Sequence, residues 1–263
     1  MKSIFALLLL LLSAQVLAVQ SKTLSVASDE WCPYICNNKS LPGFLVELLQ
    51  DIAENNDIQL KFSLIPLSRA LALTETGKLD IVLAISPQQF IGNNLQRSRL
   101  TFGISYNDFY VRRNEHWQFR DITSLHASFE NKKTLGVISG YKYGQKLDQA
   151  LKQNKENIHT ASGDGPLLAL INMLKLGRID IILDSRFAIQ YELSKSPQSN
   201  IIYAGSEGSF TPLYLGFSPH ISKEIVNIFD NGIIDFRRNG KLAAILAKYG
   251  IKDWILESTA PVQ

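Results

Sequence analysis

The sequence predicts an α/β protein with two similar lobes, each a mixed, mostly parallel sheet flanked by helices. The first observation is an internal repeat: residues 77–83 read GKLDIVL, and residues 177–183 read GRIDIIL. A second pair, TLSVAS at residues 23–28 and TLGVIS at residues 134–139, precedes the first pair in both halves. Repeats in a fixed order indicate one supersecondary plan used twice. Strand patterns that alternate with helical patterns indicate parallel sheets.

The first half contains three expected strands and two expected helices. The strands are residues 23–27, 58–64 and 80–85, and the helices are residues 43–55 and 66–76. Apolar residues at helical spacing indicate the first helix. Pro66 is typical of a helix start and Gly77 of a helix end. Because residues 81–85 are all apolar, we expect that strand to be covered on both faces.

The second half repeats this order, and two extended segments connect the halves. Its expected strands are residues 134–138, 158–161 and 180–184, and its helices run to about Gln153 and from 167 to 176. Extended segments at residues 100–112 and 214–217 are expected to cross between the lobes, followed by helices at 221–238 and 242–249. The predicted division is lobe one at 19–108 and 215–263, and lobe two at 109–214. Two crossing strands make a hinge.

The first residues predict a secretory signal peptide over residues 1–18. Lys2 precedes an unbroken apolar run over residues 4–12, and residues 16–18 read VLA, which suits cleavage after Ala18. The alternative is a membrane anchor, but the apolar run is shorter than the roughly 20 residues that span a bilayer. We therefore expect an exported, periplasmic protein.

Composition excludes several classes of partner. The formal net charge is +3, and no basic run interleaves with aromatic residues, so we expect no nucleic-acid partner. The four histidines stand far apart, which predicts no metal site, and no motif indicates a cofactor. The only cysteines, Cys32 and Cys36, are expected to form a disulfide in an exported protein. Two free thiols are the alternative.

The chain resembles the family 3 periplasmic solute-binding proteins, the receptors best known for amino-acid importers. The resemblance covers nearly the whole chain after residue 18 and rests on the order of several short segments. These are PGFLVEL at 42–48, RAL at 69–71, GKLD at 77–80, LGVISG at 135–140, GRID at 177–180, NGKL at 239–242 and YG at 249–250. The resemblance implies a two-lobed type II periplasmic binding fold, a small-molecule ligand in the cleft, and a monomer read by an inner-membrane permease or a sensor.

One segment departs from that family. Amino-acid-binding members follow the last strand of this first half with an arginine that holds the ligand carboxylate. Here residues 85–90 read ISPQQF, without arginine. Arg97 stands several residues later and takes that place only if the loop folds back. The departure argues against a simple α-amino acid as ligand.

Candidate ligand-binding residues follow from the rule that ligands bind beyond the carboxyl ends of parallel strands. The rule selects loops at residues 28–34, 85–88, 139–143 and 184–186. With the resemblance, it gives eight candidates: Trp31, Tyr34, Arg69, Ser86, Arg97, Ser139, Tyr141 and Asp184. Trp31 and Tyr34 are expected to form an exposed aromatic wall held by the disulfide. Arg69 suits a ligand carboxylate, and Asp184 suits an ammonium or hydroxyl group.

Five of these candidates have a structural alternative. Trp31 and Tyr34 serve packing instead, Arg69 pairs with Glu47 or Glu75 or is only solvated, and Ser139 caps a helix. The alternative for Asp184 is a salt bridge with Arg186. The repeated Asp80 and Asp180 are expected to be structural, since each stands where its strand starts, away from the cleft.

The leading functional prediction is therefore a binding protein that captures a small polar organic molecule, amino-acid-like or related, by closure of the lobes. Catalysis is the first alternative, because some exported cyclohexadienyl dehydratases share this fold. Glu30 and Asp184 are the only acids expected near the cleft, and no familiar catalytic motif is present, so we expect no enzyme activity. The second alternative is a binding protein that presents its ligand to a sensor.

Overall fold

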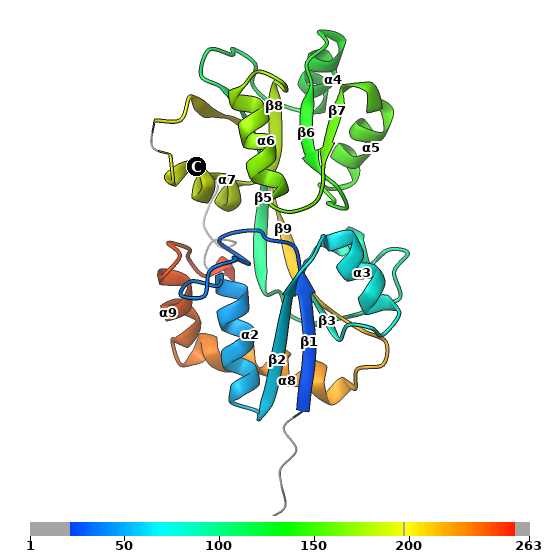
Figure 1. Ribbon diagram of the computed structural model, residues 1–263, viewed down its shortest axis with the longest axis vertical. Coiled ribbons are helices and arrows are strands. Elements are labelled where there is room, and N and C mark those ends of the chain that lie inside the picture. Colours follow the sequence, from blue (N-terminus) through cyan, green and yellow to red (C-terminus); the bar gives the residue numbers. More distant parts are fainter. Residues whose placement is uncertain (1–21, 197, 256–263) are drawn as a thin grey trace, which may run out of the picture.

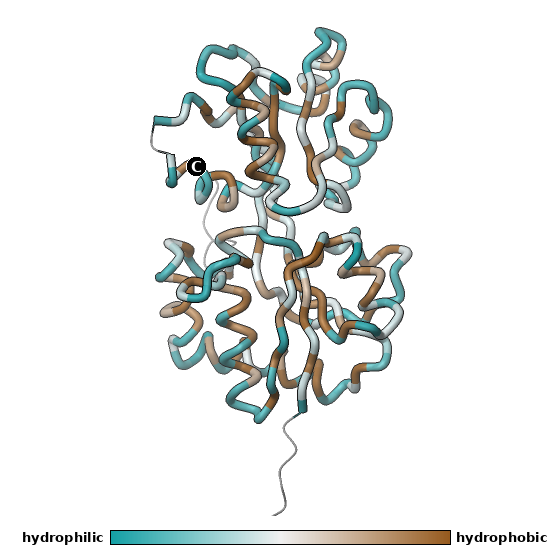
Figure 2. Tube along the Cα trace, viewed as in Figure 1, coloured by the Kyte–Doolittle hydropathy of each residue, from teal (hydrophilic) through white to brown (hydrophobic). Residues whose placement is uncertain are grey.

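The computed structural model describes residues 22–196 and 198–255, which form two lobes joined by two long strands (Figure 1). The predicted signal peptide lies outside the described residues. Each lobe has a parallel three-stranded core with helices on its faces, as the repeat predicts. In Figure 2 the hydrophobic residues follow the strands and the inner sides of the helices in both lobes.

Lobe one is built on three parallel strands in the order β2-β1-β3. The strands are β1 (Lys22–Ser28), β2 (Ile58–Leu64) and β3 (Ile81–Ile85), and the helices are α2 (Phe44–Glu54), α3 (Leu67–Glu75), α8 (Lys223–Arg238) and α9 (Lys241–Ala247). All five residues of β3 are buried, as its apolar sequence predicts. The 3-10 turn η1 (Pro87–Phe90) follows β3 directly.

Lobe two repeats the plan with strands in the order β8-β6-β7, again parallel. The strands are β6 (Leu135–Ile138), β7 (Ile158–Ala161) and β8 (Ile181–Ser185), the helices are α4 (Ile122–Glu130), α5 (Gln145–Gln153), α6 (Pro166–Lys175) and α7 (Arg186–Ser194), and the 3-10 turn is η2 (Lys155–Asn157). The helices α4 and α7 are not among the elements predicted from the sequence. The helix cap considered at Ser139 is also corrected, since Gly144 precedes α5.

The antiparallel strands β5 (Gly103–Arg112) and β9 (Ile201–Phe217) cross between the lobes (Figure 1). Residues 214–217 of β9 pair with β3 and residues 201–213 pair with β5, so the predicted crossing at 214–217 is only the end of a longer strand. The short strand β4 (Gln96–Arg97) also pairs with β9. Strand pairing therefore continues from one lobe to the other through these crossing strands.

The repeated aspartates fasten neighbouring strands at their starts. Asp80 Oδ2 accepts hydrogen bonds from the Ser25 N–H and hydroxyl, each at 2.7 Å. Asp180 Oδ2 accepts from the Thr134 N–H at 2.9 Å, and its Oδ1 lies 2.9 Å from the Arg112 guanidinium. Both carboxylates thus serve the scaffold, in agreement with the structural role expected for them.

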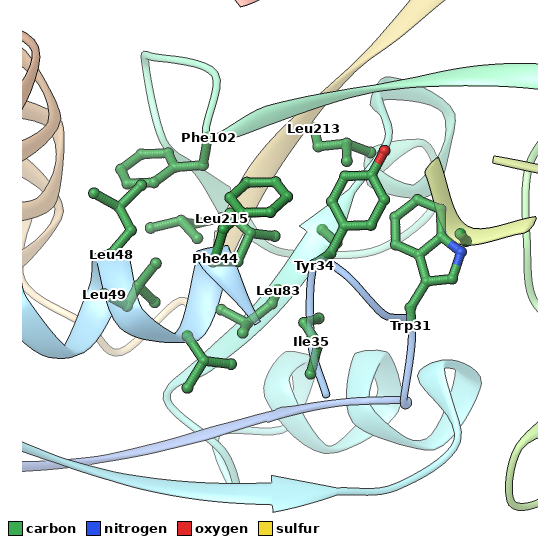
Figure 3. Packing of buried hydrophobic residues seen from close by; sticks show 14 of the residues in the cluster. Trp31, Tyr34, Ile35, Phe44, Leu48, Leu49, Leu83, Phe102, Leu213 and Leu215 are labelled. Carbon is green, nitrogen blue, oxygen red and sulfur yellow. The ribbon is translucent and has the colours of Figure 1, made fainter. Parts of the chain in front are cut away.

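The largest apolar cluster runs through lobe one and into lobe two. In Figure 3, Phe44 and Leu48 of α2 pack beside Phe102 and Leu215, and the row continues to Tyr34 and Trp31. The cluster therefore packs against the loop that follows β1. Within the described residues, no helix combines the length and hydrophobicity needed to cross a membrane.

Candidate binding cleft

A cavity of about 40 Å³ lies between the lobes, where β1, β3 and β8 end. Its lining comes from both lobes and from the crossing strands: Ser28, Asp29, Trp31, Leu67, Ala84, Ser86, Gln89, Ser105, Asn107, Tyr141, Lys142, Tyr143, Asp184, Ser185, Thr211 and Leu213. The carboxyl ends of parallel strands are the general place for ligands in open α/β sheets. The cavity is therefore the candidate site.

The loop after β1 carries the aromatic part of this lining. The disulfide between Cys32 and Cys36 is present, as predicted, and it closes a turn in which Trp31 and Ile35 are bridged. The rings of Trp31 and Tyr34 stack with centroids 4.1 Å apart (Figure 3). Both side chains are buried, which corrects the expectation of an exposed aromatic wall. They are covered because the second lobe closes over them.

Asp184 stands at the end of β8, 1 % exposed. Its Oδ1 accepts hydrogen bonds from the Trp31 indole N–H at 3.0 Å and from the Ser185 N–H at 2.5 Å. Its Oδ2 is buried with no hydrogen-bond partner among the described residues. Burial raises the pKa of Asp184 to about 7, and the nearby Asp29 charge adds to that rise.

The expected alternative partner of Asp184 is paired elsewhere. Arg186 forms an ion pair with the fully buried Asp108, with Nε 2.7 Å from Oδ2, and its guanidinium lies over the Tyr106 ring. The proposed salt bridge between Asp184 and Arg186 is therefore wrong. Asp184 consequently faces the cavity without a cationic partner among the described residues.

Asp29 is a second buried acid of the cavity and is not among the residues predicted from the sequence. Its Oδ2 accepts a hydrogen bond from the Tyr141 hydroxyl at 2.8 Å, and burial raises its pKa to about 6. Sequence analysis placed the adjacent Glu30 near the cleft. Glu30 is exposed, and its carboxylate accepts from the Asn37 N–H at 3.2 Å. The strand-end rule thus selects the correct loop but not which neighbouring acid turns inward.

Four contacts hold the lobes together across the cavity. Trp31 donates to Asp184, and Tyr141 donates to Asp29. The Gln89 side-chain amide donates to the Gly140 carbonyl at 3.0 Å, and the hydroxyls of Tyr34 and Ser185 lie 3.0 Å apart. The described conformation is therefore a closed one, in which the protein's own side chains fill much of the cleft.

The size of the cavity supports this interpretation. A volume of about 40 Å³ suits a few water molecules at most. Ligand pockets for small organic molecules are larger, roughly 300–1,000 Å³. A ligand of that size consequently requires the lobes to part and the contacts made by Trp31 and Tyr141 to change.

The structure brings together half of the predicted site residues in the lining: Trp31, Ser86, Tyr141 and Asp184. Tyr34 lies directly behind Trp31, and its hydroxyl donates to the Ile104 carbonyl at 2.7 Å. The remaining candidates, Arg69, Arg97 and Ser139, do not line the closed cavity.

Each of these three residues has a definite place in the fold. Arg69 is exposed on α3, and it makes no ion pair with Glu47 or Glu75. Arg97 is exposed on β4, with its guanidinium 4.7 Å from the Tyr214 ring centroid. The Ser139 N–H donates to the Ala161 carbonyl at 2.8 Å. Their contact with a ligand stays a prediction for the opened cleft.

Comparison with known proteins assigns the family. The model of the family "Bacterial extracellular solute-binding proteins, family 3" matches residues 24–252. This chain belongs to that family. Its members are solute-binding proteins, and the two lobes with a cleft between them are their type II periplasmic binding fold.

One curated relative and several solved structures are similar to the chain. A probable histidine-binding protein of Campylobacter jejuni is 21% identical over 217 residues, which cover 82% of this chain and 79% of the relative. An ancestral arginine-binding protein bound to arginine has a TM-score of 0.73 at 16% identity, covering 86% of this chain and 97% of the other. A histidine kinase sensor domain has a TM-score of 0.72 at 17% identity, with coverages of 86% and 94%.

The structural likeness shows the shared fold, while the low identity leaves the ligand open. A protein from Geobacillus stearothermophilus that binds arginine, lysine and histidine is likewise similar in fold but not in sequence, with a TM-score of 0.73 at 15% identity. The match covers 88% of this chain and 97% of the other. The ligand of this chain therefore has to be argued from its own cleft.

Proposed function

We propose that this solute-binding protein captures a small polar organic molecule in the cleft between its lobes and closes over it. The observation that carries the proposal is Asp184, a buried carboxylate with an unpartnered oxygen in an interlobe cavity. Buried polar atoms are normally hydrogen-bonded, so an orphan oxygen at this place indicates a missing partner. A ligand ammonium or hydroxyl group supplies one.

Closure follows from the geometry of the crossing strands. The lobes part by bending of β5 and β9, the ligand docks on lobe one, and Tyr141 and Asp184 of lobe two complete its surroundings. A ligand shifts such an equilibrium only by binding the closed form more tightly than the open one. Contacts from lobe two provide that difference in affinity. The predicted lobe boundaries, 19–108 with 215–263 and 109–214, place the hinge within these strands.

The family description as extracellular supports export. We propose that residues 1–18 are the signal peptide, that the mature protein is a periplasmic monomer, and that an inner-membrane permease reads its closed form. A sensor is the alternative reader, which the likeness to the histidine kinase sensor domain favours. Gene neighbourhood separates the two, since an adjacent permease gene supports import.

One observation favours a second candidate function, a cyclohexadienyl dehydratase-like activity. A general acid or base works best with a pKa near the working pH, and burial raises the pKa of Asp184 to about 7. Incubation with prephenate or arogenate tests this directly. Formation of the aromatic product by the wild-type protein but not by Asp184→Asn supports catalysis, and no product leaves binding as the function.

Isothermal titration against a metabolite library tests the binding proposal, and small-angle X-ray scattering of each binder reports closure. We expect one ligand to bind and to reduce the radius of gyration. The matched variants are Asp29→Asn, which changes the cavity, and Glu30→Gln, which changes the exposed neighbour. Asp29→Asn should weaken binding while Glu30→Gln leaves it unchanged. If no molecule binds, or if a bound molecule leaves the dimensions unchanged, the proposal fails.

A further inference from the structure

The cleft has an unusual charge inventory. Its lining contains two buried acids, Asp29 and Asp184, and a single basic residue, Lys142, which is exposed. Burial raises the pKa of both carboxyls, so the closed cleft resists their ionisation. A buried anionic group is tolerated when a cation pairs with it. Among the described residues, the closed cleft therefore contains two buried acids but no buried basic residue to pair with them.

The arginines nearest in sequence to the lining are engaged elsewhere. Arg186 pairs with Asp108, Arg99 pairs with Asp230, and Arg97 stacks over Tyr214. Arg69 is exposed on α3 and does not line the cavity. Among the described residues, therefore, no arginine faces Asp29 or Asp184 in the closed cleft, and none stands ready to hold a ligand carboxylate there.

The backbone donors at the strand ends are also used internally. The Ser86 N–H donates to the Gln89 side-chain oxygen at 2.9 Å, and the Ser185 N–H donates to Asp184. The Ser139 N–H donates to the Ala161 carbonyl. These are the positions from which free N–H groups would otherwise hold an anion.

The side-chain amides of the lining also donate to partners within the protein. The Gln89 amide nitrogen donates to the Gly140 carbonyl. The Asn107 amide nitrogen donates to the Tyr143 carbonyl at 2.7 Å and to the Glu207 carboxylate at 2.9 Å. The closed cleft is thus rich in oxygen acceptors, and these amide donors already have partners. The Ser86 hydroxyl is buried without a partner among the described residues, and Lys142 is exposed.

We propose that the ligand is a compact organic cation that lacks a carboxylate group: an amine, amidine or guanidine whose positive end lies against the free Oδ2 of Asp184. The proposal rests on the proposed ligand-binding function and names its ligand class. A carboxylate closed into the same cavity would face two buried acids with only the exposed Lys142 as a charged donor, and like charges in a low-dielectric site repel strongly. A cation there pairs with Asp184 and favours closure.

Matched pairs of compounds test this with one variable. Agmatine and arginine, histamine and histidine, and cadaverine and lysine each differ only by the α-carboxylate. Isothermal titration of the full mature protein gives both affinities of each pair, and scattering shows whether each binder closes the lobes. We expect at least one amine to bind at least tenfold more tightly than its amino acid and to close the protein.

Variants keep the test specific. Asp184→Asn should remove the preference for the amine, whereas Glu30→Gln, on the exposed neighbour of Asp29, should leave it unchanged. If an amino acid binds more tightly than its matched amine, or if only a neutral or anionic compound from the wider library binds and closes the lobes, the inference is overturned while the binding function stands. If no compound of any charge binds, the binding function itself fails.

Discussion

Four aspartates at opposite ends of the two parallel sheets differ sharply in how they are paired. Asp80 and Asp180, at the strand starts, each accept a backbone N–H, and Asp180 also pairs with Arg112. Asp29 and Asp184, at the strand ends, are buried with no cationic partner in the part of the chain that the structure describes, and burial raises their pKa. The same side chain holds the scaffold at Asp80 and Asp180, whereas at Asp184 its Oδ2 has no partner among the described residues and remains available for a ligand.

Binding affinity should show the largest difference between the two ends. Asp184→Asn removes the charge that faces the ligand, and breaking a desolvated charge pair costs roughly 3 kcal/mol. We therefore expect the affinity for the best ligand to fall about 100-fold. Titration of Asp180→Asn serves as the control, because that carboxylate contacts Thr134 and Arg112 rather than the cavity. Equal losses in both variants would contradict the division between scaffold and site.

The closed state of the ligand-free protein should weaken as the pH rises. In an opened, hydrated cleft an aspartate has a pKa near 3.9, whereas closure raises the pKa of Asp29 to about 6 and of Asp184 to about 7. The closed form therefore binds more protons, and its stability falls between about pH 4 and pH 7.

We expect the closed-to-open ratio to fall on the order of 100-fold between pH 5 and pH 7, because both acids lose their protons over that range and one unit of pKa shift corresponds to a factor of ten. The radius of gyration measured by small-angle scattering should rise over that range without ligand. The double variant Asp29→Asn, Asp184→Asn should flatten this dependence. A radius that stays constant, or one that rises toward low pH, would show that these acids do not control closure.

Conformational stability should reverse the order seen for binding. Asp180→Asn weakens the ion pair with Arg112 and the bond to the Thr134 N–H, so its free energy of unfolding should drop by about 2 kcal/mol. Asp184→Asn replaces a buried carboxylate, which has no cationic partner among the described residues, by a neutral group of similar size and should leave stability unchanged or raise it. Urea unfolding at pH 8 measures both. A larger loss of unfolding free energy for Asp184→Asn than for Asp180→Asn would contradict this expectation.

Much of the fold could be predicted because the repeat fixes the order of elements. β2 and β7 occupy the residues expected for them, and Asp80 and Asp180 have the structural places that their repetition indicated. Two helices were missed for physical reasons. Residues 122–130 of α4 contain Thr, Ser and His, which favour helix weakly. α7 begins directly after β8, with no loop between them.

The site could be predicted only as far as the strand ends. The strand-end rule located Trp31 and Asp184, because β1 and β8 are clear in the sequence. It could not choose between the adjacent Asp29 and Glu30, since beyond a strand no alternation defines which side chain turns inward. Arg97 illustrates a long-range effect: pairing of β4 with β9 sets its position over Tyr214, and no local pattern encodes that pairing.

The hydrogen bond from Trp31 to Asp184 should have the smallest measurable effect. Trp31→Phe keeps an aromatic ring for stacking on Tyr34 but removes the indole N–H that reaches Oδ1 across the cleft. The loss of one hydrogen bond to a carboxyl costs about 1.5 kcal/mol in the closed form. In the ligand-free protein at pH 5 we therefore expect a modest rise in radius of gyration.

The same variant distinguishes two roles of the Trp31 indole, namely holding the empty cleft closed and contacting the bound ligand. If Trp31 serves only to hold the empty cleft closed, Trp31→Phe opens the free protein and leaves the affinity for the ligand nearly unchanged or slightly higher, since the empty closed form is then less stable. If the indole also contacts the bound ligand, the affinity falls as well. Tyr141→Phe is the matched comparison, because it removes the hydroxyl that donates a hydrogen bond to Asp29 on the other side of the cavity. If neither variant opens the ligand-free protein, apolar contact between the lobes, rather than these two hydrogen bonds, keeps the cleft closed.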